Sequence, residues 1–324
     1  MDNIVDDPFE QMTFTYDRCF LCGSFLTETN YTEEHIIPKW LQRKFNLWNK
    51  ELILLNQTSI KYKDLKIPCC KKCNNIMSKK IENPIKQGVE QGYKGFIHID
   101  EQVIFQWLNK ISYGFLFKEL SLKAQLSNRN SDPIYKPEFL KEHKMQYLFL
   151  KSLISNTTFI NNPLSILIFK INPDGVESYW ASDNPFIKTL CIRMDDIGVI
   201  AHLMDNGYNK GFFLEHQEMS ELLEKTLHPI QFAELCAKFI YKSSLFYRDP
   251  FYTTLFDNKH NPHTIISNNL SGYGYRDWIQ EEYAHVLAFY WNNWGYNFDD
   301  IYKGNDLVLS FLRNEDGTFK DFFN

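Results

Sequence analysis

The sequence lacks any long hydrophobic run. Its longest apolar stretches, such as residues 286–291, fall far short of the roughly 20 residues that a membrane-spanning helix needs. The N-terminus, residues 1–7, is acidic where a secretory leader would be basic and then apolar. Internal repeats, low-complexity tracts and linkers rich in Pro or Ser are missing as well. We therefore expect a cytoplasmic protein with no membrane segment.

No residue class and no sign of charge dominates the composition. The chain has 35 Lys and Arg residues against 40 Asp and Glu residues, for a formal net charge of −5, and 44% of its residues are hydrophobic. These values are typical of a folded soluble protein and exclude disorder, collagen and coiled coil as descriptions of the whole chain. A length of 324 residues favours two domains.

The cysteines are too few and too unevenly placed for a disulfide framework. There are seven, an odd number, and five of them lie between residues 19 and 73. Cys19 and Cys22 form one CxxC pair, and Cys70 and Cys73 form another. Two such pairs in a short segment are typical of a structural zinc ion held tetrahedrally by four thiolates. Cys69 is a spare ligand, but only Cys70 completes the CxxC spacing.

Positive charge is concentrated in one segment. Residues 39–80 contain eleven basic and two acidic residues, a local charge of +9, whereas the flanking segments are each acidic. Such an excess is expected of a surface that binds a polyanion, although a solvated lysine-rich face is the simpler alternative. The basic residues that we expect to contact nucleic acid are Lys39, Arg43, Lys44, Lys71, Lys72 and Lys79.

Hydrophobic periodicity predicts an α+β fold. Near the N-terminus we expect a strand over residues 32–40 and a helix over residues 74–91 that is interrupted at Asn83-Pro84. Beyond these, helices are predicted for residues 100–126, 138–154, 219–245 and 278–291. Strands are predicted for residues 165–169, 189–194 and 198–203, with a final hairpin from 307–312 and 319–323.

The change in charge and motif content near residue 95 predicts two domains. Residues 1–95 would form a ββα module around the four cysteines. Residues 96–324 would form a larger mixed α/β domain with long helices and a short antiparallel sheet, which serves targeting, regulation or sensing. We expect residues 96–324 to bind a regulatory ligand or protein.

Between the two CxxC pairs lies Thr32-Glu33-Glu34-His35-Ile36-Ile37-Pro38-Lys39, and Asn74-Asn75 follows the last cysteine. This arrangement resembles the HNH (ββα-metal) endonuclease family in its four-cysteine zinc form, over about residues 17–90. The resemblance implies that His35 is the general base that deprotonates the attacking water. It implies that Glu34 and Asn74 hold a catalytic divalent ion, Mg²⁺ or Mn²⁺, because oxygen ligands favour a hard cation.

Two features leave this assignment open. Adjacent residues on a strand point to opposite sides, so Glu34 and His35 can share one site only if the strand ends or bulges there. The middle Asn of the family motif is also absent, since Asp64-Leu65 stands near its place and Asn56 lies further upstream. That residue normally holds the loop that carries the histidine.

The sequence thus predicts a metal-dependent endonuclease that hydrolyses phosphodiester bonds, with DNA as substrate by family resemblance. A regulated defence effector is one setting that fits this architecture. The first alternative is a zinc-stabilised protein that binds nucleic acid without cutting it. The second is an interaction module whose lysine-rich segment contacts an acidic protein.

Overall fold

A computed structural model describes residues 9, 14–120, 122–124, 132, 134, 137–173, 175–247, 250–256, 262–268, 274–314 and 316–323. The chain divides into two compact units. Unit 1 comprises Met1–Glu90, His98–Asn161 and Tyr252–Ser267, and unit 2 comprises Gln91–Ile97, Asn162–Phe251 and Asn268–Asn324. Helices and short sheets occur in both, which confirms the predicted mixed α/β class.

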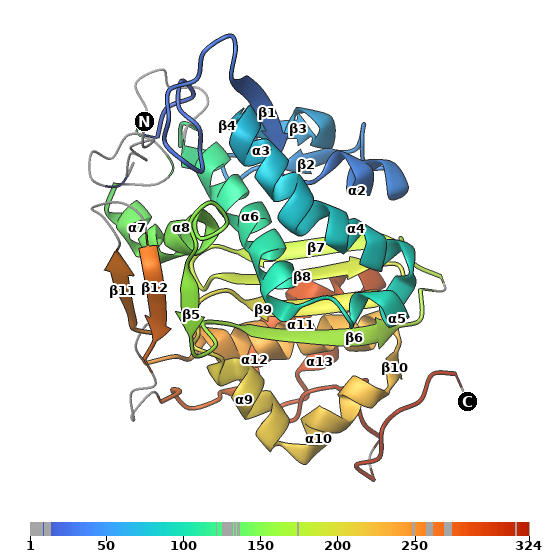
Figure 1. The fold of residues 1–324 in the computed structure, drawn as a ribbon. Coiled ribbons are helices and arrows are strands. Elements are labelled where there is room, and N and C mark those ends of the chain that lie inside the picture. Colours follow the sequence, from blue (N-terminus) through green and yellow to red (C-terminus); the bar gives the residue numbers. More distant parts are fainter. Residues whose placement is uncertain are drawn as a thin grey trace. The chain divides into compact units, whose positions relative to one another are not determined.

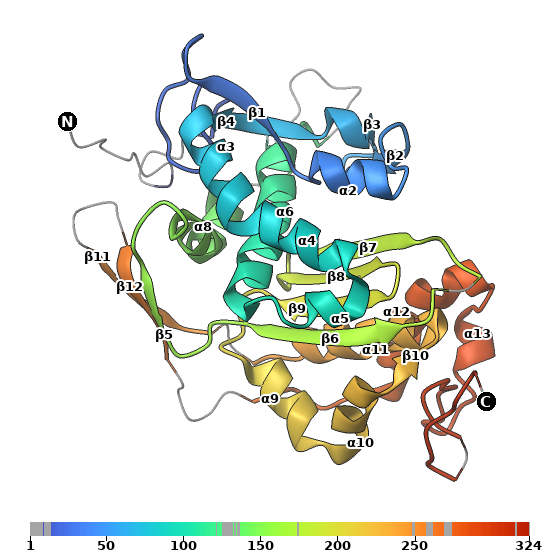
Figure 2. The same cartoon turned by 45° about the vertical axis from the view of Figure 1, so that its right-hand side comes forward.

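Unit 1 contains the expected ββα arrangement at its N-terminal end. Strand β1 (Tyr31–His35) pairs antiparallel with β4 (Lys66–Cys70), and β4 leads directly into helix α3 (Lys71–Met77), as Figure 2 shows. The register places Tyr31 opposite Cys70 and His35 opposite Lys66. The strand predicted for residues 32–40 is too long, because α2 (Lys39–Lys44) begins directly after Pro38.

The helix predicted for residues 74–91 is a nearly continuous run with one local irregularity. A π-helical turn, Ser78–Glu82, joins α3 to α4 (Asn83–Glu90). Pro84 lacks a backbone N–H, and its ring displaces the carbonyl one turn earlier, which widens that turn. The predicted interruption at Asn83-Pro84 is therefore this π turn and not a break.

Helix α6 (Glu101–Leu120) is buried along almost its whole length and carries several buried polar side chains. The Gln106 amide donates to the Phe149 carbonyl (2.7 Å), and the Asn109 amide donates to the Gln146 carbonyl (2.9 Å). These bonds join α6 to α8 (Lys144–Lys151). The helix predicted for residues 100–126 ends at Leu120; residues 121, 125 and 126 lie outside the described part of the chain.

The predicted helix over residues 138–154 is two shorter helices, α7 (Pro137–Glu142) and α8, interrupted at His143. A three-stranded sheet in the order β11-β12-β5 completes unit 1, with β12 parallel to β5. The remaining elements are β2 (Glu51–Ile53), β3 (Ser59–Lys61), the 3₁₀ turn Tyr62–Asp64, β5 (Thr158–Ile160), β11 (Tyr252–Phe256) and β12 (Pro262–Ser267).

Unit 2 is built on a five-stranded sheet in the order β10-β6-β9-β8-β7, covered on one face by helix α11 (Pro229–Ser244), as Figure 1 shows. All neighbours are antiparallel except β10 and β6. The strands are β6 (Ser165–Ile171), β7 (Tyr179–Asn184), β8 (Thr189–Met194), β9 (Ile197–His202) and β10 (Thr226–Leu227). The strand predictions for β6, β8 and β9 are confirmed within a few residues, whereas β7 was not expected.

The helices of unit 2 are α5 (Gly92–Phe96), α9 (Tyr208–Glu215), α10 (Gln217–Ser220), α11 (Pro229–Ser244), α12 (Gln280–Trp291) and α13 (Phe298–Ile301). Helix α12 packs on α11, and α13 packs on α12. The helix predicted for 219–245 is wrong at its start, because the 3₁₀ turn Glu221–Glu224 and β10 precede Pro229. The predicted C-terminal hairpin is confirmed around its turn but is shorter than predicted. Arg313 bridges Phe319 antiparallel, and the Lys320 amide donates to the Leu312 carbonyl (3.0 Å).

Candidate functional site

The first cysteine pair lies on a tight turn. Arg18 and Phe25 form an isolated antiparallel bridge, and between them the Gly23 amide donates to the Cys19 carbonyl (2.8 Å). Gly23 has a φ of +71°, a left-handed conformation that costs glycine little. The turn therefore brings Cys19 and Cys22 to the same side, as the zinc prediction requires.

The second pair lies at the junction of β4 and α3. Cys70 ends the strand and is the N-cap of the helix, where its sulfur accepts a bond from the Cys73 amide (3.4 Å). Cys73 lies in the first turn of α3 and is buried. One cysteine at the strand end and one in the helix start therefore face a common point.

The four sulfurs converge as a metal cluster does. The Sγ atoms of Cys19, Cys22, Cys70 and Cys73 all lie within 4.8 Å of one another, and those of Cys22 and Cys70 are 3.8 Å apart. A tetrahedral zinc ion with Zn–S bonds of about 2.3 Å places its sulfurs about 3.8 Å apart. Four sulfur donors at this separation can hold a zinc ion. Within the described residues, no second group of His, Cys, Asp and Glu side chains meets this condition.

Cys69 is next to this cluster but outside it. Its sulfur lies 4.0 Å from that of Cys19 and 3.4 Å from the Cys70 carbonyl oxygen. Burial raises the pKa of the Cys69 thiol, so the protonated form is favoured. The structure thus brings together the CxxC cysteines and leaves Cys69 as a buried neighbour.

Glu34 and His35 point in different directions from the end of β1. The Glu34 carboxylate is buried and forms an ion pair with the ammonium of Lys110, which is fully buried on α6. Lys110 also bonds to a Glu82 carboxylate oxygen (2.7 Å) and to the backbone carbonyl of His35 (2.7 Å). Two carboxylates and the backbone of the histidine thus share one buried cation.

Burial controls the protonation of the Glu34 carboxylate. Burial raises the pKa of Glu34 to about 7, and the Lys110 ammonium only partly opposes this. Lys110 was not predicted as a site residue. The sequence contains one signal for it. Lys110 lies in an apolar helical stretch near Gln106 and Asn109, whereas an exposed lysine is expected on a polar helix face.

His35 is 7% exposed, and its ring stacks on Trp48 at a centroid distance of 6.1 Å. The buried Nε2 atom has no hydrogen-bond partner among the residues that the structure describes. Burial, followed by the charges of nearby lysines, lowers the pKa of His35 to about 4. The imidazole is therefore neutral at physiological pH.

Asn74 lies in α3 beside β1, and its amide donates to the Glu33 carbonyl (3.3 Å). The Glu33 side chain forms an exposed ion pair with Lys66 (2.8 Å). The three residues predicted for catalysis thus come from the adjacent elements β1 and α3, but each has a different partner. A shared divalent ion on Glu34 and Asn74 stays a prediction, because the Glu34 carboxylate is engaged by Lys110.

The loop after His35 is held without the middle Asn of the family motif. The Ile36 amide donates to the Leu65 carbonyl (3.1 Å), and the buried Gln42 side chain donates to the Ile37 carbonyl (2.7 Å). Asn56, the upstream candidate, instead donates to the Lys123 carbonyl (3.1 Å). Gln42 is therefore a positioning residue that the sequence did not indicate.

The predicted nucleic-acid contacts are all on the surface of unit 1. They are exposed on α2 (Lys39, Arg43, Lys44), on the first turn of α3 (Lys71, Lys72) and on the π turn (Lys79). Lys71 is tied to the Thr29 carbonyl (2.9 Å), and the Arg43 guanidinium lies 5.8 Å from the centre of the Trp48 ring. The ring that stacks on His35 is thus flanked by an exposed cation.

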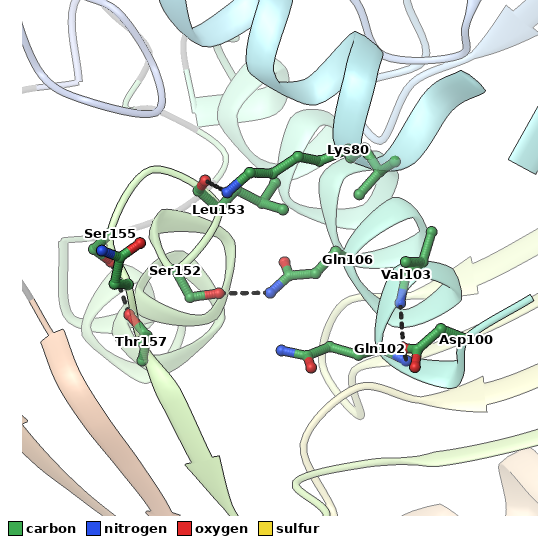
Figure 3. A pocket seen from close by; sticks show the side chains of 11 residues that line it. Lys80, Asp100, Gln102, Val103, Gln106, Ser152, Leu153, Ser155 and Thr157 are labelled. Atoms are coloured by element: carbon green, nitrogen blue, oxygen red, sulfur yellow. Dashed lines mark hydrogen bonds between the residues drawn. The ribbon is translucent and has the colours of Figure 1, made fainter. Parts of the chain in front are cut away.

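A second feature of unit 1 is a cavity of about 380 Å³ between the π turn, the start of α6 and the segment after α8 (Figure 3). The Lys80 ammonium bonds to the Leu153 carbonyl (2.8 Å), and the Gln106 amide bonds to the Ser152 hydroxyl (2.7 Å). None of the predicted catalytic or metal-binding residues lines this cavity.

Comparison with protein-family models, with curated proteins and with solved structures gives no match. The similarity to HNH endonucleases therefore rests on the residues described above. No helix in the described part of the chain is long and apolar enough to cross a membrane.

Proposed function

We propose that this protein is an HNH-type endonuclease that hydrolyses phosphodiester bonds in DNA, with His35 as general base. The observation that carries the proposal is the location of His35 at the end of β1. That strand pairs with β4, whose end contributes Cys70 to the four-sulfur cluster. A zinc ion on this cluster would fix the Cys19–Cys22 turn against the β4–α3 junction, and β1 is part of the same small scaffold.

The residues of this site would supply a proton acceptor and a cationic surface. A neutral imidazole accepts a proton from water, and burial keeps His35 in that form. The exposed lysines of α2 and α3 would bind the phosphate backbone without regard to base sequence.

The residues predicted for a catalytic ion do not form a free ligand set. Glu34 is paired with Lys110, and Asn74 bonds to a backbone carbonyl. We therefore derive no step through Mg²⁺ or Mn²⁺, and the requirement for either ion remains part of the test.

The Glu34–Lys110 ion pair also favours a second function, a zinc-stabilised protein that binds nucleic acid without cleaving it. A carboxylate that neutralises a buried lysine stabilises the fold and need not hold a metal. The two functions share the zinc cluster and the basic surface, and they differ in what His35 contributes.

The deciding experiment incubates supercoiled plasmid, single-stranded DNA and RNA with the purified chain in the presence of Mg²⁺ or Mn²⁺. The variants are His35→Ala and, as a matched control, His98→Ala, which replaces an exposed histidine of the same unit. We expect nicking or linearisation by the wild type and the control, loss in His35→Ala, and loss in EDTA. Binding by all three without cleavage would support the second function.

A role as a defence effector is tested in cells. We expect expression to protect against phage, or to be toxic, in the wild type and the His98→Ala variant but not in His35→Ala. Equal protection by all three would show that the effect does not depend on the proposed chemistry.

A further inference from the structure

Unit 2 contains a cavity of about 470 Å³ next to β7, β8 and the start of α11. Its wall is largely aromatic, from Trp180, Phe232 and Trp294, and Pro229 at the first turn of α11 adds to it. Two charged residues line it, Arg193 on β8 and Glu177. A cavity of this size, with aromatic walls and a few charged and polar groups, is typical of a small-molecule site.

The strand register explains why these groups meet. Trp180 pairs with Arg193, and Arg193 pairs with Gly198, so the three positions form one row across the sheet. Directly opposed residues in an antiparallel pair present their side chains on the same face. At Gly198 a Cβ atom would lie 2.6 Å from the Phe232 ring. The missing side chain therefore admits this ring beside Arg193, and most other residues would exclude it.

Arg193 is 6% exposed, and its charge is poorly compensated. One Nη2 donor bonds to the Glu177 carbonyl (2.7 Å), whereas Nε has no hydrogen-bond partner among the described residues. Burial lowers the pKa of Arg193, and the Glu177 charge only partly opposes this; the guanidinium remains protonated at neutral pH. A buried guanidinium with an unpartnered Nε is costly to the fold, and an anion supplied from outside would offer that donor an acceptor.

We infer that this cavity binds a small planar aromatic anion, such as a nucleotide or an aromatic carboxylate. The anionic group pairs with Arg193, with whose guanidinium phosphates and carboxylates form bidentate bonds. The ring packs against the tryptophan and phenylalanine side chains of the wall. The positive end of the α11 dipole at Pro229 adds a weaker attraction for the anion. This inference does not depend on the proposed nuclease activity.

The test measures binding to the full chain by calorimetry with three probes. AMP and 2-naphthoate each carry a ring and an anionic group, and adenosine carries a ring without the charge. The variants are Arg193→Met and, as a matched control, Arg276→Met, which replaces an exposed arginine of the same unit. We expect at least one anionic probe to bind the wild type and the control, and to bind Arg193→Met about 10- to 100-fold more weakly.

Each outcome has a defined meaning. Binding of AMP alone identifies a phosphate ligand, binding of 2-naphthoate alone identifies a carboxylate, and adenosine should bind weakly and equally to all three proteins. The inference is overturned if neither anionic probe binds the wild type, or if Arg193→Met binds them equally well.

Stability separates a ligand-binding arginine from a structural one. Because the guanidinium is buried and its Nε has no hydrogen-bond partner among the described residues, Arg193→Met should unfold at the same urea concentration as the wild type or a higher one. If Arg193→Met fails to fold, Trp294→Leu replaces it, since that half-buried side chain lines the same cavity. It should weaken the binding of the anionic probes and of adenosine alike, and unchanged affinity would overturn the inference.

Discussion

His35 lies where its protonated form is disfavoured, because burial and then neighbouring lysines lower its pKa to about 4. A general base with this pKa stays active far below the usual histidine range near 6.5. We expect the single-turnover cleavage rate to be flat from pH 8 to about 5 and to fall about tenfold per pH unit below 4. A pH–rate profile with a midpoint near 6.5 would contradict this assignment.

The ring of Trp48 provides a control for that profile. Trp48→Leu removes the surface stacked on His35 and admits water, which stabilises the imidazolium. The midpoint of the pH–rate profile should therefore move up toward 6.5.

The lowered pKa of His35 also affects the stability of the fold. The folded state takes up the His35 proton later than the unfolded state, so the contribution of His35 to folding is lost as pH falls from about 6.5 to 4.

Lys110 bonds to Glu34, to Glu82 and to the backbone carbonyls of His35 and Ile36, and so ties these groups together. Lys110→Met leaves two carboxylates without their buried counter-ion, and we expect the free energy of unfolding to fall by about 3–5 kcal/mol. Urea denaturation measures this change. Lys86→Met is the control, because its exposed pair with Glu90 (3.7 Å) should contribute less than about 1 kcal/mol.

A double-variant cycle then isolates the pair itself. Glu34→Gln in the Lys110→Met background removes one of the uncompensated charges, so it should recover part of the lost stability. Strictly additive losses would mean that Glu34 and Lys110 do not depend on each other.

Among the elements, the four-sulfur cluster makes the sharpest prediction, because two adjacent buried cysteines have different roles. Cys70→Ser should lower the bound zinc from about one ion per chain to a small fraction and reduce the melting temperature. Cys69→Ser is the matched control and should keep both. Metal content measured by mass spectrometry decides the matter. If only Cys69→Ser loses zinc, then Cys69 is the zinc ligand and Cys70 is the buried neighbour.

The elements also show what one sequence can and cannot predict. Apolar runs separated by turn residues predicted β6, β8 and β9, and paired CxxC spacing predicted the cysteine cluster, because both signals are local. The predicted strands at 307–312 and 319–323 are too long, because alternation of apolar residues does not fix how far pairing extends from the turn, and among the described residues only those next to the turn pair across it. The partner of Lys110 could not be predicted, since Glu34 lies far away in the sequence and only the tertiary fold joins them.

At the scale of the whole molecule, the two units are not continuous stretches of chain. Unit 1 takes up β11 and β12, and β12 reaches β5 by parallel pairing, with Thr264 opposite Thr158. A pairing across more than a hundred residues leaves no local pattern. Composition and charge therefore indicated that residues 39–80 are distinctive, but they did not reveal which later segments pack around them.

The uneven charge predicts how the whole chain binds nucleic acid. Its net charge of −5 opposes binding, so affinity must come from the local excess of +9 in residues 39–80. Each phosphate contact releases counterions, and the logarithm of the binding constant should fall linearly with the logarithm of salt concentration. Replacing the exposed Lys72 and Lys79 with Met should reduce that slope by about 1 each and weaken binding to all sequences alike.

Lys303→Met is the matched control, because it removes an exposed lysine from unit 2 and should leave the slope unchanged. Titration of a labelled duplex at several salt concentrations measures all of these slopes. Affinity that does not respond to salt would exclude phosphate contacts by the basic segment, and with them both nucleic-acid functions. The lysine-rich surface would then belong to the remaining hypothesis, contact with an acidic protein.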